Sequence, residues 1–130
     1  MSKIIIYKRE GYYWSGNSTP QLETLAEFFT SDVTSGARGW IDFVSDSKFV
    51  ITTSNVSSVE NDQGNIIVGD LLHDDDEIRV DTTTMPLEAF VAMLERWEEL
   101  YKQKPDEIII KEDDNGKISM IGKFADGREI

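Results

Sequence analysis

Apolar residues recur every three or four positions between residues 87 and 101, and this is the clearest pattern in the chain. The set comprises Leu87, Phe90, Val91, Leu94, Trp97 and Tyr101. This spacing places them on one side of a helix, with acidic residues largely on the other side. Pro86 suits the first helical position, Lys102 and Lys104 suit the last turn, and Pro105 stops the helix. Roughly 17 residues at about 1.5 Å each predict a helix of about 25 Å, which needs a sheet to lie on.

The residues after Pro105 predict a hairpin. Residues 106–113 contain a β-branched run, and residues 117–124 form the returning strand. The pair Asn115-Gly116 lies between them and predicts a type I′ turn, because both residues tolerate a positive φ. A lone hairpin is marginally stable in water, so earlier strands must complete the sheet.

The first part of the chain predicts those strands and one short helix. Residues 3–7 and 12–14 form a hairpin around Gly11, and Thr19 caps a helix whose first residue is Pro20. Residues 30–39 are polar and contain glycine, which predicts a loop. Further strands are predicted at residues 39–44, 49–53, 66–69 and 77–82, with turn residues between them.

Short links join these elements, and short links favour antiparallel neighbours because parallel strands need long crossovers. We therefore predict an α+β fold: a twisted antiparallel sheet, with one long helix in the C-terminal half and one short N-terminal helix packed on it. The length of 130 residues predicts a single domain over residues 1–130. Burial is the favoured interpretation for each of the three tryptophans, Trp14, Trp40 and Trp97.

Composition narrows the biochemical classes. The chain has no cysteine, which excludes disulfides, thiol nucleophiles and zinc sites built on thiolates. It has no apolar run long enough to span a bilayer and no signal peptide, so we expect a cytoplasmic protein that does not enter membranes.

The net charge of the chain indicates which kinds of molecule it can bind. There are 13 Lys and Arg residues against 25 Asp and Glu residues, a formal net charge of −12. Such a surface repels nucleic acid and anionic membranes and attracts basic partners. Solubility alone is the competing explanation for this charge.

The sequence contains few residues that commonly act in catalysis. His73 is the only histidine, and it stands next to Asp74, Asp75, Asp76 and Glu77 in a predicted loop. The spacing of these acids does not match the alternating ligands of an EF-hand loop, so a solvated acidic loop is favoured over a metal site. A pair of carboxylates could support glycoside hydrolysis, but no feature of the sequence selects a pair. We therefore predict a protein that is not an enzyme and has no metal or cofactor.

Several segments resemble immunity proteins of bacterial polymorphic-toxin and contact-dependent growth inhibition systems. They are residues 85–90 (MPLEAF), 94–100 (LERWEEL) and 104–110 (KPDEIII), together with the opening residues 4–7 (IIIY) and 11–14 (GYYW). The resemblance covers about a third of the chain, at structural positions. It implies a small cytoplasmic inhibitor that binds the toxic C-terminal domain of its partner, often a nuclease, and blocks it.

The acidic composition agrees with this implication, because a nuclease presents basic groups to phosphate. The first candidates for toxin binding are Asp74, Asp75, Asp76 and Glu77, the densest acidic run, followed by Asp113 and Asp114 at the tip of the last hairpin. Two alternatives remain open. One is an acidic DNA mimic or another protein-binding module, and the other is a small enzyme that uses carboxylates.

Overall fold

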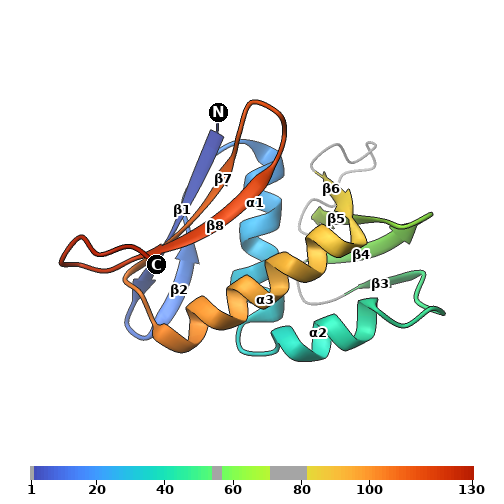
Figure 1. Cartoon of the computed structure of the whole chain (residues 1–130), viewed down its shortest axis with the longest axis horizontal. Coiled ribbons are helices and arrows are strands. Elements are labelled where there is room, and N and C mark those ends of the chain that lie inside the picture. The colour runs from blue at the N-terminus through green and yellow to red at the C-terminus, as the bar shows by residue number, and fades with distance from the viewer. Residues whose placement is uncertain (1, 54–56, 71–81) are drawn as a thin grey trace.

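A computed structural model describes residues 2–53, 57–70 and 82–130, which form two four-stranded antiparallel sheets with helices packed between and beside them (Figure 1). The predicted α+β class is confirmed. The strands are divided between two sheets, however, where the sequence predicted one. This division decides which residues reach the surface.

The first sheet unites the two ends of the chain. Its order is β2 (Tyr12–Ser15), β1 (Ser2–Arg9), β7 (Glu107–Glu112) and β8 (Ile118–Lys123). The predicted hairpin around Gly11 is confirmed. Glu10 and Gly11 both have positive φ, at 55° and 84°, as a type I′ turn requires.

The turn between β7 and β8 differs from the predicted type I′ turn. Only Gly116 has a positive φ there, at 80°, while Asn115 does not. The main-chain nitrogen of Gly116 donates to the carbonyl of Asp113 at 3.0 Å. The carboxylate of Asp113 also accepts hydrogen bonds from the main-chain nitrogens of Asn115 and Lys117, each at 2.9 Å. These bonds hold a type I turn followed by a left-handed glycine, the usual form of a three-residue hairpin loop.

The second sheet is built from the middle of the chain. Its order is β3 (Ile51–Thr53), β4 (Ser57–Asp62), β5 (Asn65–Asp70) and β6 (Thr82–Pro86). The strand predicted at residues 49–53 is shortened to β3, and the strand predicted at 66–69 is confirmed within β5. Of the strand predicted at 77–82, only Thr82 lies within the described residues, where it begins β6.

Four helical segments pack against the sheets. They are α1 (Pro20–Glu27), the π-helical turn η1 (Phe28–Val33), α2 (Ala37–Val44) and α3 (Leu87–Gln103). The cap of α1 is as predicted, since the hydroxyl of Thr19 accepts from the main-chain nitrogen of Leu22 at 3.4 Å. No helix in residues 2–53, 57–70 and 82–130 is long and apolar enough to cross a membrane.

Two predictions for the region before β3 were wrong. Residues 39–44 are helical rather than extended, and much of the predicted loop at residues 30–39 belongs to η1 and α2. The buried residues of α2 are Ala37, Ile41 and Val44, spaced by four and three positions. That spacing forms one helical face, which packs on α3, so tertiary contact overrides the β propensity of a segment rich in aromatic and branched residues.

The long helix α3 confirms the predicted helix. Its start is one residue later than predicted, because Pro86 has an extended conformation and ends β6. At the other end Lys104 adopts a left-handed φ of 55° just before Pro105. The buried residues of α3 are Phe90, Met93, Leu94, Trp97 and Leu100.

The core lies between the two sheets and collects residues from every helix. The first sheet contributes Ile4, Ile6, Ile108 and Ile110, and the second contributes Val59, Ile66 and Val68. Trp97 is fully buried, as predicted, and Trp40 is partly buried. Trp14 is 53% exposed, so the prediction of burial was wrong for it. Neighbouring strand residues point to opposite faces, and Tyr13 takes the inward position.

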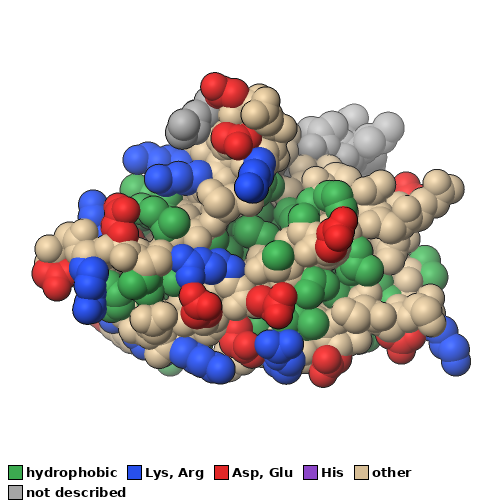
Figure 2. All heavy atoms as spheres, viewed as in Figure 1, with side chains coloured by type: hydrophobic (Ala, Val, Ile, Leu, Met, Phe, Trp, Pro, Cys, Tyr) green, Lys and Arg blue, Asp and Glu red, His purple; other side chains and the backbone are tan. Residues whose placement is uncertain are grey.

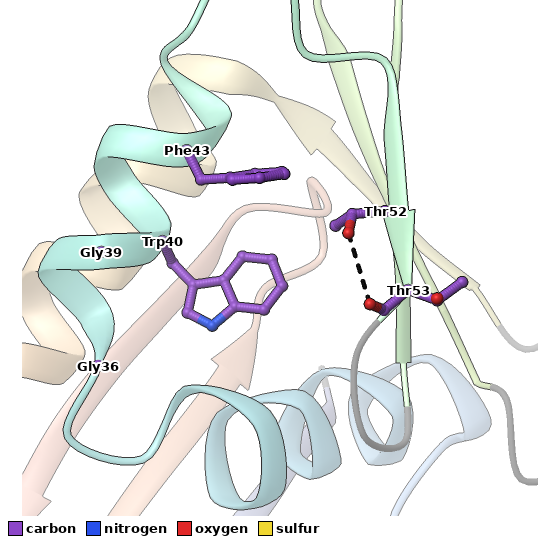
Figure 3. A pocket seen from close by; sticks show the side chains of 6 residues that line it. All are labelled: Gly36, Gly39, Trp40, Phe43, Thr52 and Thr53. Carbon is purple, nitrogen blue, oxygen red and sulfur yellow. Dashed lines mark hydrogen bonds between the residues drawn. The ribbon is translucent and has the colours of Figure 1, made fainter.

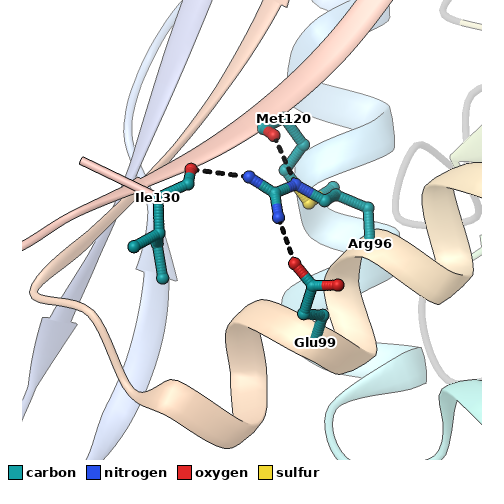
Figure 4. A network of polar contacts seen from close by, with 4 residues as sticks. All are labelled: Arg96, Glu99, Met120 and Ile130. Carbon is teal, nitrogen blue, oxygen red and sulfur yellow. Dashed lines mark hydrogen bonds and ion pairs between the residues drawn. The ribbon is translucent and has the colours of Figure 1, made fainter.

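Arg96 ties α3 to the first sheet (Figure 4). Its Nε donates to the carbonyl of Met120 in β8 at 2.9 Å, and one Nη donates to the main-chain oxygen of Ile130 at 2.6 Å. The other Nη pairs with Glu99 one turn further along α3. The planar guanidinium therefore joins three segments, which the single ammonium of lysine could not do with the same geometry.

Candidate functional site

The structure describes one of the two predicted acidic clusters. Asp74, Asp75, Asp76 and Glu77 lie outside the described residues. Asp113 and Asp114 are exposed at the tip of the β7–β8 hairpin, at the end of the molecule away from α2 (Figure 1). Asp113 has a structural role there, because its carboxylate accepts the two main-chain hydrogen bonds of the turn. Binding of a toxin by either cluster stays a prediction.

A cleft lies between α2 and β3, and we call it the aromatic cleft. It has a volume of about 330 Å³ and is lined by Gly36, Gly39, Trp40, Phe43, Thr52 and Thr53. Figure 3 shows the rings of Trp40 and Phe43 projecting from α2 toward the strand that carries Thr52 and Thr53. One wall of the cleft is therefore aromatic, and the other is formed by the side chain of Thr52 and by Thr53, whose side chain points away from α2 (Figure 3).

An unbroken row of aromatic rings connects the cleft to the core. The ring of Phe28, which is fully buried, lies 5.0 Å from that of Trp40. Trp40 lies 6.2 Å from Phe43, and Phe43 lies 5.1 Å from Phe49, all with edge-on geometry. The indole nitrogen of Trp40 also donates to the carbonyl of Asp32 at 3.3 Å. Edge-on pairs of this kind are favourable beyond simple burial, so the cleft wall is held in a defined shape.

Three large apolar side chains beside the cleft are exposed, and we call them the apolar patch. Phe43 is 47% exposed, Val50 is 62% exposed and Ile51 is 60% exposed. They lie at the end of α2 and at the start of β3, which is an edge strand of the second sheet. Ile51 alternates with Thr52, so it lies on the face of the sheet that points away from the cleft, and the patch extends around the edge strand β3. Single exposed apolar residues are ordinary, but several of them beside an aromatic cleft and an open sheet edge indicate a binding surface.

Three acidic residues lie close to members of the apolar patch in the sequence or across the sheet. Figure 2 shows acidic and basic side chains interspersed on the face of the molecule seen in Figure 1. Asp42 precedes Phe43 in α2, and Asp46 follows the helix, and both are exposed. Glu60 is the cross-strand partner of Ile51, so the two side chains lie next to each other on one face of the sheet. From Trp40 to Asp70 the sequence has five acidic residues and one basic residue, Lys48. An apolar centre with a charged rim is the usual anatomy of a protein–protein interface.

Sequence reasoning missed this surface. The sequence predicted a strand at residues 39–44, and a strand would place Trp40 and Phe43 on opposite faces of a sheet. A signal was available, because Ala37, Ile41 and Val44 have helical spacing and leave Phe43 on the outward side. Exposure of Val50 and Ile51, in contrast, follows only from the position of β3 at the sheet edge.

A second concavity lies beside β2 and contains Tyr13. The hydroxyl of Tyr13 donates to the carbonyl of Pro105 at 2.6 Å. Burial, with smaller contributions from Asp106 and Tyr101, raises the pKa of Tyr13 to about 12. The hydroxyl of Tyr13 therefore stays protonated well above neutral pH. Its hydrogen bond has a structural role, because it joins β2 to the segment that follows α3.

Within the described residues, no three His, Cys, Asp or Glu side chains are grouped so that they could hold a metal ion. No protein-family model matches the chain, and no curated protein and no solved structure matches it.

Proposed function

We propose that this protein is a non-catalytic immunity protein that binds and neutralises a basic toxin domain, with a nuclease as the best-fitting toxin class. The observation that carries the proposal is the apolar patch of Phe43, Val50 and Ile51 beside the aromatic cleft, with acids close to it. The resemblance in sequence to immunity proteins supplies the biological setting.

The apolar patch would supply affinity. Full burial of a Phe, Val or Ile side chain contributes about 1.5–3 kcal/mol. Because these three side chains are about half exposed in the free protein, covering them would contribute about 1 kcal/mol each. The aromatic row behind Phe43 holds the surface in place, which reduces the entropy lost on binding.

The acidic residues would raise the rate of association with the toxin and favour basic partners over others. Asp42, Asp46 and Glu60 would meet basic groups at the rim of the interface. The other acids of the chain, with the predicted clusters at residues 74–77 and 113–114 among them, would attract a basic domain at long range. The attraction would weaken as salt shortens the screening length to about 8 Å at physiological ionic strength.

The test requires a candidate toxin: if a gene beside that of this chain encodes a large secreted protein, the C-terminal domain of that protein is the one to test for binding. Co-purification and inhibition of that domain's activity are expected for the wild-type chain. The double variant Phe43→Ser/Ile51→Ser should weaken the complex by about tenfold or more, because its interface loses two apolar side chains. Tyr12→Ser is the matched control, since Tyr12 is also exposed but lies on β2, and it should bind as the wild type does.

Failure of the wild-type chain to bind that domain would contradict the immunity function itself. Equal binding by Phe43→Ser/Ile51→Ser and wild type would show that the complex forms elsewhere. The acidic clusters have a separate test, in which each is neutralised with Asn or Gln and association is measured at low and high salt. Unchanged rates at low salt would remove those residues from the steering role.

A further inference from the structure

The first sheet has an outward face that the helices leave uncovered. Its inward face carries Ile4 and Ile6, which are buried in the core against α1 and α3. Ile5 and Tyr7 alternate with them and point to the other side. Figure 1 shows the helices on the side of this sheet that faces the second sheet. The middle of the outward face is apolar, with Ile5 and Ile121 partly exposed and Ile109 8% exposed between them, and no helix of the described chain lies on it.

The strand register arranges this outward face into a middle row, two flanking rows and, at one end, the pair Arg9 and Tyr12. The middle row is Ile5, Ile109 and Ile121. One flanking row is Trp14, Tyr7, Glu107 and Lys123, and it continues to Glu129, which is bridged to Lys123. The other flanking row is Lys3, Lys111 and Ser119. Residues paired across antiparallel strands share a face and touch, so each row is a continuous line of side chains.

We propose that this outward face binds a second copy of the chain, with a two-fold axis along the middle row. Such an axis exchanges the two flanking rows and leaves the middle row facing itself. Ile109 then packs on the partner's Ile109, Glu107 meets the partner's Lys111, and Tyr7 meets the partner's Lys3. A two-fold interface must be complementary to itself, and this arrangement of rows meets that condition.

The contacts made in this way are chemically favourable. The two Glu107–Lys111 pairs bring opposite charges together across the interface. The ammonium of Lys3 faces the ring of Tyr7, which is 39% exposed and available for a cation–π contact. Trp14, 53% exposed, extends the apolar area at one edge. The inference does not depend on the proposed toxin, because it uses a different surface.

Charge explains why this face is suited to self-association in so acidic a chain. It carries four basic residues, Lys3, Lys111, Lys123 and Arg9, against two acids, Glu107 and Glu129, whereas the whole chain has a net charge of −12. Two copies can therefore approach through this face without bringing their acidic surfaces together. The acids elsewhere still repel at long range, which limits the affinity.

The size of the face sets the expected strength. Strands of about six residues at 3.3 Å, in a sheet of four at about 4.8 Å spacing, give a face of about 19 by 20 Å, or about 400 Å² per partner. A standard stable interface buries about 800 Å² per partner. We therefore expect a reversible dimer with a dissociation constant of about 10–100 μM.

Sedimentation velocity over a concentration range spanning that constant tests the proposal, with three charge variants. Glu107→Lys and Lys111→Glu each place like charges opposite each other twice in the dimer, and each should weaken it by about tenfold. The double variant Glu107→Lys/Lys111→Glu restores opposite charges across the axis, so its dimerisation should return to within about threefold of wild type. Lys102→Glu, on the exposed side of α3, changes the net charge by the same amount as Lys111→Glu and should have little effect.

Thermal melts followed by circular dichroism will establish that each variant is folded. A wild-type chain that stays monomeric throughout the range would overturn the proposal, as would a double variant no better than the two single variants. Recovery in the double variant alone requires that residues 107 and 111 of different copies meet.

Discussion

Replacement of Trp97 gives the most direct test of how the core is held together. The indole is fully buried and lies at the centre of four elements. Its ring stacks on Phe29 of η1 at 5.1 Å and meets the edge of Tyr13 of β2 at 6.0 Å. Its nitrogen donates to the carbonyl of Thr34 at 2.7 Å, just before α2 begins. Trp97→Ala therefore removes contacts that join α3 to three other segments.

The expected loss follows from these contacts. Truncating a buried tryptophan to alanine costs about 3–5 kcal/mol, through lost burial and the cavity that remains. The lost hydrogen bond adds about 1 kcal/mol. Trp97→Phe keeps most of the ring contacts and loses the donor, so it should cost about 1–2 kcal/mol. For a chain of this length, each kcal/mol lowers the melting temperature by roughly 3–6 °C.

Urea denaturation followed by far-UV circular dichroism is the suitable assay, because fluorescence would lose one of the three tryptophans that report unfolding. We expect a lower midpoint with an unchanged slope for both variants, and a larger effect for alanine. A loss below about 1 kcal/mol for Trp97→Ala would refute the reasoning, since it would mean that the indole is exposed and α3 is turned differently. Trp14→Ala is the control, because its exposed ring should cost little.

Three further changes test the rest of the fold. Gly116→Val should lower the melting temperature, because a β-branched residue resists the positive φ of the β7–β8 turn. Asn115→Val is the control, because φ of Asn115 is not positive, and it should lower the melting temperature less. Equal decreases for the two variants would contradict the turn geometry. Arg96→Met should lower the free energy of unfolding by about 1–3 kcal/mol, because two carbonyls lose their charged donor. If urea denaturation shows that Arg96→Lys is as stable as wild type, the forked geometry of the guanidinium is not required. Tyr13 has a folded pKa raised to about 12, so its contribution to stability is complete below the unfolded pKa of about 10 and is lost as pH rises from about 10 through about 12. Tyr13→Phe should flatten that alkaline decline in melting temperature, and an identical decline in both proteins would assign it to other groups.

The elements that sequence predicted well are those whose signals are local. The helix α3 has its apolar spacing, its preceding proline and its terminal lysines within one short stretch. The first hairpin needs only the left-handed conformations of Glu10 and Gly11 between two apolar strands. Thr19 and Pro20 mark the start of α1 in the same way. Interactions between residues a few positions apart can be predicted from the sequence alone. The fold class then follows from the order of the predicted helices and strands.

The tertiary structure decided what depends on distant partners. Whether residues 39–44 are helix or strand was settled by packing on α3, some fifty residues later in the chain. Local propensity gave a different answer for this segment. The partition of the strands into two sheets likewise depends on which strands find each other, and no local signal encodes that pairing.

The surfaces that matter for the proposals follow from the same decisions. Phe43 and Ile51 are outside because α2 is a helix and β3 is an edge strand, although each residue type favours burial. Ile5, Ile109 and Ile121 form one row only because β1, β7 and β8 pair in a particular register. The sequence by itself determined that the chain is acidic and rich in apolar strands. Only the pairing of distant segments determined which apolar residues fill the core and which are left for a partner, because burial is a property of the assembled layers and not of a residue.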